Sequence, residues 1–210
     1  TAGLSSGFSD SDYEAVNCRI VDSPNEIFDN VEMVVKVKEP QKEEIALCSS
    51  DLTMFTYFHF AASEKLTKLF LETGATAIAY ETIMAKDGSL PLLIPMSEVA
   101  GRMSVQEGAK FLEKVKGGRG ILLGGVPGVE PAKVTILGGG IVGTNAALVA
   151  AGLGANVFIL DINLKRLRYL DEIMPKNVRT IYSNQFNIRE HLKQTDLLIG
   201  AVLIPGAKAP

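Results

Sequence analysis

A glycine-rich hexamer between two apolar segments constrains the fold more than any other feature. The hexamer GGGIVG at residues 138–143 follows an apolar run that starts at Val134, and it precedes a segment rich in alanine. Strand, tight turn and helix in this order predict a βαβ unit. Gly138 allows the turn, Gly140 lets a ligand approach the backbone, and Gly143 lets the helix pack against the sheet. Because N–H groups at a helix start favour phosphate, the segment predicts a dinucleotide site.

An aspartate at the end of the next apolar run indicates which dinucleotide binds. Asp161 follows the run 157–160, which is the expected second strand of the unit. A carboxylate there accepts hydrogen bonds from the adenosine ribose hydroxyls and repels a 2′-phosphate. Arg166 lies nearby and keeps NADP open as an alternative, since a cation tolerates that phosphate. The unit from Val134 to Asp161 therefore favours NAD as the cofactor.

The C-terminal half alternates short apolar runs with helical segments. We expect strands at 134–137, 157–160, 178–182 and 197–201, and helices that reach about residue 153 and cover 164–173 and 188–193. This alternation predicts an α/β fold with a Rossmann-like, doubly wound parallel sheet. We place this NAD-binding domain at residues 95–210.

A long helix is expected at the start of that domain, from Ser97 to Lys116, and a helix of this length can join two domains. Its apolar positions are Val99, Met103, Phe111, Leu112 and Val115. The glycine-dense segment 117–129 that follows leaves little room for regular structure.

A second α/β pattern fills residues 1–94. We expect strands at 33–38, 53–58 and 76–79, and short helices near residues 10–16 and 24–28. Ser63 caps a further helix that Gly74 ends. Strand, helix and strand again predict a parallel sheet. Both domains are expected to be incomplete, because the chain begins at Thr1 without methionine and stops at Pro210 just after an apolar run.

Composition excludes several classes of function. The 21 basic and 24 acidic residues give a net charge of -3, which does not favour nucleic-acid binding. Cys18 and Cys48 lack metal-site spacing and a nearby histidine cluster, so we expect reduced thiols and no metal. No apolar run is long enough to span a bilayer, and no signal-peptide pattern opens the chain. We expect a soluble, cytoplasmic protein.

Lys38 and His59 are the candidates for chemistry, since both follow expected strands at the sheet edge where α/β folds place ligands. The alternative for Lys38 is a solvated surface charge. The alternative for His59, between two phenylalanines, is a hydrogen-bonded core histidine. His191 is the other histidine, on a polar helix where we expect a surface position. Acid–base chemistry by an imidazole would therefore fall to His59.

Several motifs, in order, resemble those of the L-alanine dehydrogenase family. They are KVKEP at 36–40, HFAAS at 59–63, AYET at 79–82, PMSEVAGR at 95–102, GGVPGV at 124–129, the glycine hexamer, LDIN at 160–163 and GAVLIPG at 200–206. The resemblance covers essentially the whole chain. It implies an NAD-dependent oxidoreductase that converts L-alanine reversibly to pyruvate and ammonia.

The resemblance also implies roles for residues. Residues 1–94 would form the substrate and catalytic domain, in which Lys38 holds the substrate's carboxylate or carbonyl oxygen and His59 is the acid–base catalyst. Glu81 would help at the interdomain hinge. Besides the glycines, the cofactor-binding residues carried over are Ser97, Ile141, Val142, Asp161, Arg166, Ser183, Val202 and Leu203. Ser97 would reach the nicotinamide side or the phosphates from the start of its helix.

Alternatives remain open at this stage. The NAD-binding subunit of a proton-translocating transhydrogenase resembles this family but handles no small substrate, and Lys38 with His59 argues against it. A non-catalytic NAD-binding fragment is the other alternative. Family members bring a substrate-binding arginine before Thr1 and an aspartate after Pro210, so we expect weak NAD binding and little turnover from this chain alone. The family also implies a homo-oligomer, a hexamer by resemblance, while amino-acid specificity stays open.

Overall fold

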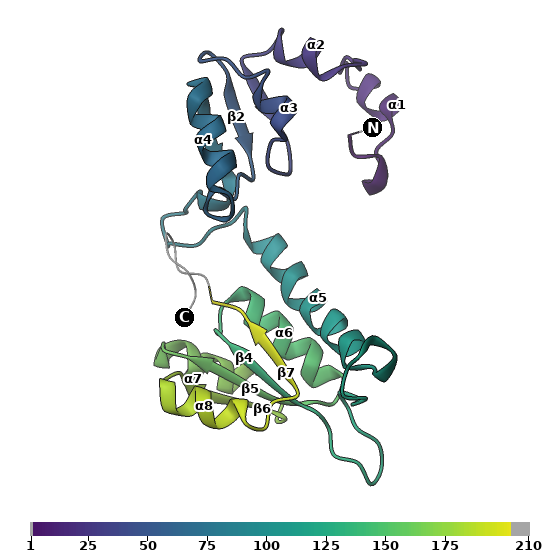
Figure 1. The fold of residues 1–210 in the computed structure, drawn as a ribbon, viewed down its shortest axis with the longest axis vertical. Helices are drawn as coiled ribbons and strands as arrows, with labels where there is room; N and C mark the ends of the chain where they lie inside the picture. The colour runs from purple at the N-terminus through teal and green to yellow at the C-terminus, as the bar shows by residue number, and fades with distance from the viewer. Residues whose placement is uncertain (1, 203–210) are drawn as a thin grey trace. The chain divides into compact units, whose positions relative to one another are not determined.

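The computed structural model describes residues 2–202, and the chain divides into two compact units, Thr1–Leu90 and Pro91–Pro210. Within the described residues, the first unit carries a three-stranded sheet and the second a four-stranded sheet, and all strand pairs are parallel (Figure 1). The expected α/β class with parallel sheets is confirmed.

The sheet of the first unit has the strand order β1-β2-β3. Its strands are β1 (Met33–Val35), β2 (Thr53–Thr56) and β3 (Thr76–Ala79). The α-helices of this unit are α1 (Asp10–Glu14), α2 (Pro24–Phe28), α3 (Lys42–Ile45) and α4 (Glu64–Thr73). Its 3-10 helices are η1 (Leu4–Ser6), η2 (Phe60–Ala62) and η3 (Tyr80–Thr82).

Helix α4 forms for the reasons that the sequence indicates. The Ser63 side chain accepts a hydrogen bond from the N–H of Leu66, which caps the first turn, and Gly74 ends the helix at φ 71°. Phe70 on its inner face is buried and packs edge-on against Phe58 of the core, with ring centroids 4.9 Å apart. The predicted helix and its two boundaries are confirmed.

Two strands of the first unit end earlier than predicted. Strand β1 stops at Val35 rather than near Lys38, and β2 stops at Thr56 rather than Phe58. One more main-chain bond follows β1, from the N–H of Lys36 to the carbonyl of Phe55 at 3.1 Å, and side chains then become the hydrogen-bond partners. The Tyr80 hydroxyl donates to the carbonyl of Val37, and the Thr56 hydroxyl donates to the carbonyl of Lys38 at 2.7 Å. The residues after both strands therefore form loops at the carboxyl edge of the sheet.

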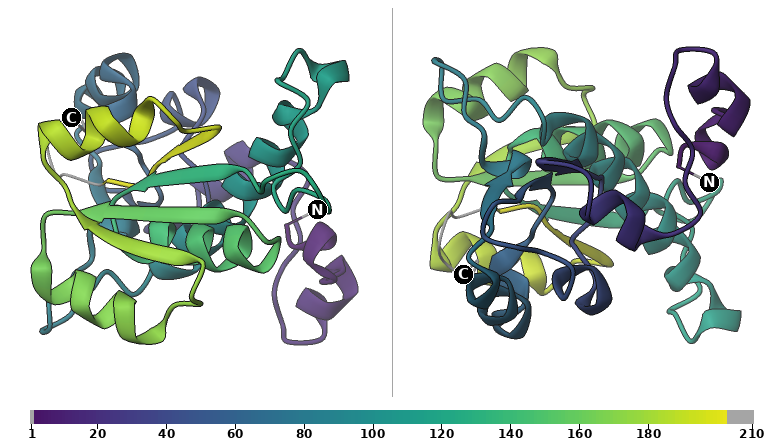
Figure 2. Two further views of the ribbon diagram at one scale, coloured as in Figure 1. Left: turned by 90° about the horizontal axis from the view of Figure 1, so that it is seen from below. Right: turned by 90° about the horizontal axis from the view of Figure 1, so that it is seen from above.

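The sheet of the second unit has the order β6-β5-β4-β7. Its strands are β4 (Lys133–Leu137), β5 (Asn156–Asp161), β6 (Val178–Tyr182) and β7 (Leu197–Gly200). Its helices are α5 (Ile94–Leu112), η4 (Lys114–Lys116), α6 (Ile141–Gly152), α7 (Leu164–Ile173) and α8 (Gln185–Leu192). Figure 2 shows α6 and α7 on one face of this sheet and α8 on the other. The predicted doubly wound sheet is confirmed.

Helix α5 differs from the predicted segment 97–116 at both ends. It begins at Ile94, with Pro95 in its first turn, and it ends at Leu112, where a separate 3-10 turn follows. Ser97 therefore lies inside the helix and does not start it. The buried residues of the helix are Gly101, Val105 and Leu112. Of the apolar positions singled out in the sequence, only Leu112 is therefore buried, and the others are exposed.

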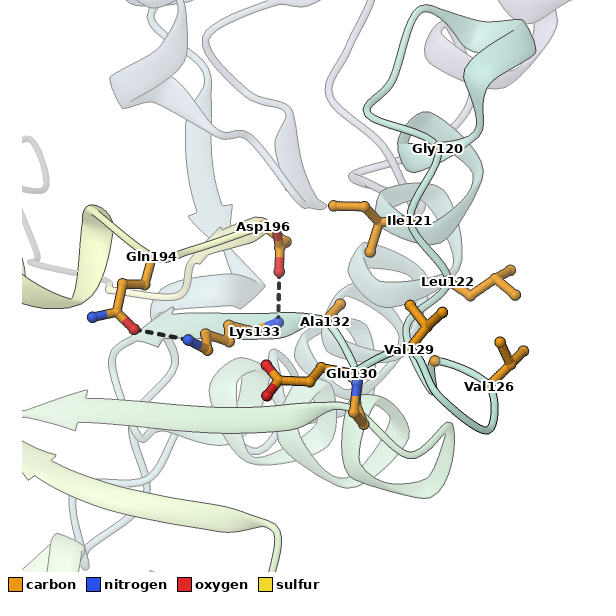
Figure 3. A pocket seen from close by; sticks show the side chains of 12 residues that line it. Gly120, Ile121, Leu122, Val126, Val129, Glu130, Ala132, Lys133, Gln194 and Asp196 are labelled. Carbon is orange, nitrogen blue, oxygen red and sulfur yellow. Dashed lines mark hydrogen bonds between the residues drawn. The ribbon is translucent and has the colours of Figure 1, made fainter.

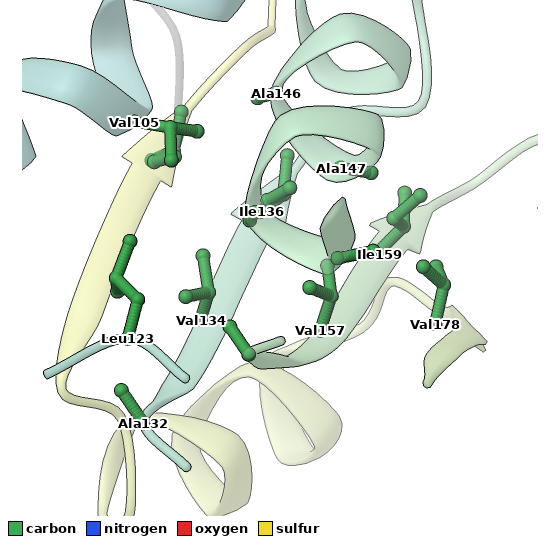
Figure 4. Packing of buried hydrophobic residues seen from close by; sticks show 14 of the residues in the cluster. Val105, Leu123, Ala132, Val134, Ile136, Ala146, Ala147, Val157, Ile159 and Val178 are labelled. Carbon is green, nitrogen blue, oxygen red and sulfur yellow. The ribbon is translucent and has the colours of Figure 1, made fainter. Parts of the chain in front are cut away.

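The core of the second unit lies between the sheet and α6. Figure 4 shows Val134 and Ile136 of β4 beside Val157 of β5, close to Ala147 of α6. All four side chains are fully buried. Because the α6 side chains in this core are alanines, the helix can approach the strands closely, as the small-residue segment after the glycines predicts.

Other expectations concern surface and chemistry. Cys18 and Cys48 are both free thiols. In residues 2–202 no three His, Cys, Asp or Glu side chains gather as a metal site would require, and no helix there could cross a membrane. His191 is half-buried rather than on the surface, since its ring packs 4.8 Å from that of Phe158.

Candidate functional site

The strand order of the second unit reverses at the glycine turn. Strands β5 and β6 lie on one side of β4, whereas β7 lies on the other, so a crevice is expected at the carboxyl ends of β4 and β7. Gly138 follows β4 directly with φ 102°, a conformation that favours glycine. A Cβ at this position would stand 2.6 Å from the carbonyl oxygen of Ala201, just after β7. The turn therefore lies at the switch point of the sheet.

The three glycines of the hexamer differ in what surrounds them. A Cβ on Gly143 would stand 1.9 Å from the carbonyl oxygen of Gly138, so that position requires glycine for packing. A Cβ on Gly140 would meet no atom within 4 Å. Helix α6 begins at Ile141, and no side chain caps its first turn. An open approach and uncapped N–H groups together suit the pyrophosphate of a dinucleotide.

Asp161 ends β5 beside this turn. One oxygen of its carboxylate accepts the N–H of Gly139 at 2.6 Å, and the other accepts the N–H of Asn163 at 2.8 Å. The first bond ties the carboxylate to the glycine turn, and the second orders the start of α7. The aspartate is therefore held next to the turn, where the ribose of a bound dinucleotide is expected.

Arg166 is directed to the glycine turn rather than left free. Its Nε donates to the carbonyl of Gly139 at 2.6 Å, and its Nη2 donates to the hydroxyl of Thr144 at 2.7 Å. Its guanidinium carbon also lies 5.0 Å from the centre of the Tyr169 ring. Because these donors are engaged within the protein, Arg166 supports the shape of the turn, and the sequence did not indicate that contact.

The remaining predicted cofactor residues lie at various distances from the turn. Val142 occupies the first turn of α6, and Ser183 follows β6, its N–H donating to the carbonyl of Asp161 at 2.9 Å. A Cβ on Gly138 would stand 3.2 Å from the Cγ2 of Val202. Ser97 is half-buried in α5. Leu203 lies outside the described residues.

The first unit brings Lys38, Tyr57 and His59 together at the carboxyl edge of its sheet. The Nζ of Lys38 lies 5.3 Å from the centre of the Tyr57 ring, in cation–π range. The ring of His59 lies 5.4 Å from the same centre. The aromatic ring of Tyr57 is therefore within reach of both candidate side chains, and it was missed in the sequence. Strand alternation does not account for this contact, because Tyr57 and His59 both lie beyond the end of β2 at Thr56.

His59 and Lys38 are both exposed. For His59 this excludes the alternative of a core histidine, whereas for Lys38 it agrees with the alternative of a solvated surface charge. His59 is not a core histidine, because the buried neighbour Phe58 takes the core position instead. Lys38 has 70% of its side chain exposed, and its Nζ lies 3.9 Å from a carboxylate oxygen of Glu39. Lys36, two residues earlier, is less than one-quarter exposed and pairs with Glu44 at 2.5 Å. One lysine of the pair is therefore structural and the other is available.

A pocket of about 320 Å³ adjoins His59. Glu39, Lys42, Phe58 and Ser63 are among its other lining residues. A buried oxygen of the Glu39 carboxylate has no hydrogen-bond partner in the described part of the chain. The space next to the imidazole thus combines apolar walls with several charged and polar groups, a mixture that is typical of sites for small molecules.

Burial and charge perturb the tyrosines of this edge. Desolvation raises the pKa of the Tyr57 phenol above its ordinary value of 10.0, and the nearby charges of Glu81 and Glu39 raise it further. Desolvation and Glu81 raise the pKa of Tyr80 in the same way. Both phenols are therefore neutral hydrogen-bond donors at physiological pH.

In the second unit, a larger pocket of about 630 Å³ lies at the amino ends of β4 and β7, at the other end of these strands from the glycine turn (Figure 3). Its wall includes Lys133 at the start of β4 and Asp196 before β7, joined by a hydrogen bond of 2.9 Å from the Lys133 N–H. Arg119 forms an ion pair with the same aspartate. These contacts hold loops together at the amino ends of the strands, and none of the predicted site residues lines this pocket.

Two family models together match nearly the whole chain. The model described as Alanine dehydrogenase/PNT, N-terminal domain matches residues 1–100, and the one described as Alanine dehydrogenase/PNT, C-terminal domain matches residues 104–210. The chain belongs to the alanine dehydrogenase/PNT family. The resemblance inferred from the motifs is thereby confirmed.

Named relatives agree with this assignment. The chain is 57% identical to the alanine dehydrogenase of Methanococcus maripaludis and 54% identical to that of Halomonas elongata, each over 209 residues. These matches include 100% of the chain but 56% of each relative, so the chain spans about half the length of the curated relatives it matches.

Solved structures give the same picture. An L-alanine dehydrogenase structure is 54% identical, with a TM-score of 0.86, and the match covers 100% of this chain and 58% of that one. A transhydrogenase from Sinorhizobium meliloti, 24% identical with a TM-score of 0.75 over 100% of this chain and 60% of its own, shares the fold.

Proposed function

We propose that the protein catalyses the reversible, NAD-dependent oxidative deamination of L-alanine to pyruvate and ammonia. The observation that carries the proposal is the grouping of an exposed imidazole and an available ammonium around Tyr57, at the carboxyl edge of a parallel sheet. The names of the relatives support the same reaction. Hydride transfer between two nucleotides, as in a transhydrogenase, would leave Lys38 without a substrate oxygen to bind and His59 without a substrate proton to transfer.

The chemistry requires a group for the substrate's oxygens and a group for protons. The Lys38 ammonium would pair with the carboxylate of alanine or the carbonyl oxygen of pyruvate. In the oxidative direction, after hydride has left the α-carbon, His59 would take a proton from the water that attacks this carbon and pass it to the nitrogen that leaves as ammonia; the reverse direction runs these transfers backwards. NAD, when bound, accepts the hydride that leaves the α-carbon.

The second unit would hold that cofactor. Gly140 leaves space for the pyrophosphate, and the start of α6 supplies N–H groups. Asp161 would accept the hydroxyls of the adenosine ribose and disfavour a 2′-phosphate, and Arg166 would keep the turn in shape instead of binding that phosphate. The proposed cofactor-binding set also contains Ser97, Ile141, Val142, Ser183, Val202 and Leu203.

Partner and location are proposed by the same resemblance. We infer a homo-oligomer, with a hexamer as the family precedent, that works in the cytoplasm on L-alanine, pyruvate and ammonia. Neither nucleic acid nor a membrane belongs to this proposal. A non-catalytic NAD-binding role is the second candidate, and the expected mark of that role is thermal stabilisation by NADH without turnover.

Replacing His59 tests the proposed reaction, and the second histidine of the chain supplies a matched control. The His59→Gln protein should lose about 10²- to 10⁴-fold in kcat for alanine-dependent NADH formation, because general acid–base catalysis contributes that much. The His191→Gln protein should keep its kcat, since that ring packs on Phe158 and belongs to no part of the proposed catalytic group. Equal kcat values for His59→Gln and the unaltered protein would reject the acid–base role.

A further inference from the structure

The main chain at His59 adopts a conformation that needs support. His59 has φ 51° and ψ 39°, in the left-handed region that residues with a Cβ rarely occupy. Its neighbour Phe58 is fixed in the core, where its ring stacks on Phe60 at 4.5 Å. The left-handed turn lets the chain leave the buried strand position and present the imidazole outside the core. Something must hold that turn in place.

Glu81 makes the contacts that hold it. Its carboxylate accepts the N–H of His59 at 2.9 Å and the N–H of Phe58 at 3.2 Å. Glu81 comes from η3, directly after β3, and the register of β2 with β3 pairs Thr56 with Ala79. The side chain therefore reaches across from the neighbouring strand to the point where β2 has ended.

We propose that Glu81 is a positioning residue for the reaction, which fixes the main chain of His59 so that the imidazole faces the substrate. It accepts the two main-chain N–H groups that no strand partner takes up beyond Thr56. No hydrogen bond joins Glu81 to the imidazole in the described residues, so it acts through the backbone and not as an acid or base. The catalytic consequence rests on the proposed function, whereas the contact itself does not.

This role differs from the hinge role that the motif resemblance implies for Glu81, which stays a prediction. Its charge also lies close enough to raise the pKa of Tyr57 and Tyr80, which places the carboxylate among the aromatic rings of the site edge. A charged acceptor forms stronger hydrogen bonds with N–H groups than a neutral one. Glutamate at this position is therefore suited to hold a strained turn.

Two substitutions at Glu81 and one control separate positioning from general stability. Glu81→Gln keeps a side-chain oxygen that can accept one or both N–H groups, whereas Glu81→Ala removes it. Glu72→Ala, an exposed glutamate of α4, serves as the control. The readouts are amide hydrogen exchange at residues 58 and 59, followed by NMR, and kcat with KM for alanine-dependent NADH formation.

In the Glu81→Ala protein, the N–H of His59 should lose its protection, and kcat should fall about 10²-fold because the imidazole is misplaced. Glu81→Gln should retain protection and restore kcat to within about tenfold of the unaltered protein, since a neutral acceptor holds the turn more weakly. KM for NAD and the exchange of amides in α4 should stay unchanged in both. Glu72→Ala should match the unaltered protein.

The outcomes distinguish this proposal from the proposed function. If the unaltered protein, tested together with the arginine and aspartate segments that the resemblance implies, shows no alanine-dependent turnover, the function is wrong. Exchange at His59 alone then decides whether Glu81 holds the turn. Full protection of that N–H in Glu81→Ala overturns the proposal in either case. A kcat equally low in both Glu81 variants, with protection retained in Glu81→Gln, overturns the positioning role and assigns Glu81 to the chemistry itself.

Discussion

Tyr57 shows how one side chain can serve two neighbours at once. Its ring lies beside both the Lys38 ammonium and the His59 imidazole. The ring also packs against that of Tyr80, with the two ring centres 5.9 Å apart. It also offers the ammonium an attractive surface when substrate is absent.

The raised pKa of Tyr57 predicts a weakening of the fold at alkaline pH. A phenol whose pKa is higher in the folded state than in the unfolded state stabilises the fold below the ordinary value of 10.0. That contribution is lost as pH rises through the raised pKa. Ultraviolet titration of the phenolate band should show that part of the tyrosine ionises at a pH above the ordinary pKa. The Tyr57→Phe substitution should remove some of this late phase, which is the ionisation at high pH. The free energy of unfolding, measured in urea, should then fall less steeply with pH above 10.0 in the Tyr57→Phe protein than in the unaltered protein.

Tyr169→Phe is the matched control, because this tyrosine is about half exposed. It should leave the late part of the titration intact. A late phase of the same size in the Tyr57→Phe protein would show that burial and the two glutamates do not act on Tyr57 as described.

At the scale of elements, the turn between β4 and α6 separates what folding requires from what a ligand requires. Gly143 is enclosed by the backbone of Gly138, whereas Gly140 faces open space. Gly140→Ala should therefore leave the free energy of unfolding within about 1 kcal/mol, while NADH binding weakens about tenfold or more because the new methyl group meets the pyrophosphate. Fluorescence titration with NADH and urea unfolding measure the two effects.

Gly152→Ala supplies the comparison for this test. Gly152 ends α6 and also has no atom within 4 Å of an added Cβ, so alanine should leave both stability and NADH binding nearly unchanged. If Gly140→Ala bound NADH as tightly as Gly152→Ala, the dinucleotide would not approach the backbone at Gly140.

The sequence predicted these elements well wherever local chemistry decides them. Ser63, Gly74 and the glycine hexamer each act on their own neighbours, so their boundaries could be read directly. The ends of β1 and β2 could not, because the Tyr80 hydroxyl and the Glu81 carboxylate reach them from the turn that follows β3. The same reason hid the Arg166 contacts, which depend on the fold bringing residues 139 and 144 to α7.

At the scale of the whole molecule, the second unit carries an outward apolar surface on α5. Val99, Met103 and Phe111 are each at least half exposed. Side chains of this kind are typical of surfaces that pair with another subunit. The proposed homo-oligomer gives them a partner of the same sequence.

The self-association prediction follows from that surface. Met103→Glu and Phe111→Glu should each lower the assembly mass measured by sedimentation, because a charge would be buried between subunits. Leu71→Glu, on the exposed side of α4, should leave the mass unchanged. An assembly that tolerates both α5 substitutions would place the subunit contact elsewhere, and a monomeric unaltered protein would remove the oligomer from the proposed function.

The position of β7 beside β4 has a consequence for how the protein is made. The Lys133 N–H and the Asp196 carboxylate that bind at the start of these strands are 63 positions apart in the chain, and Gly138 rests against the residues that follow β7. A ribosome must therefore deliver β5, β6 and the helices between them before the glycine turn gains its second wall. The nucleotide site therefore matures only after β7 has been made, and nascent chains should become able to retain NADH only after β7 has emerged.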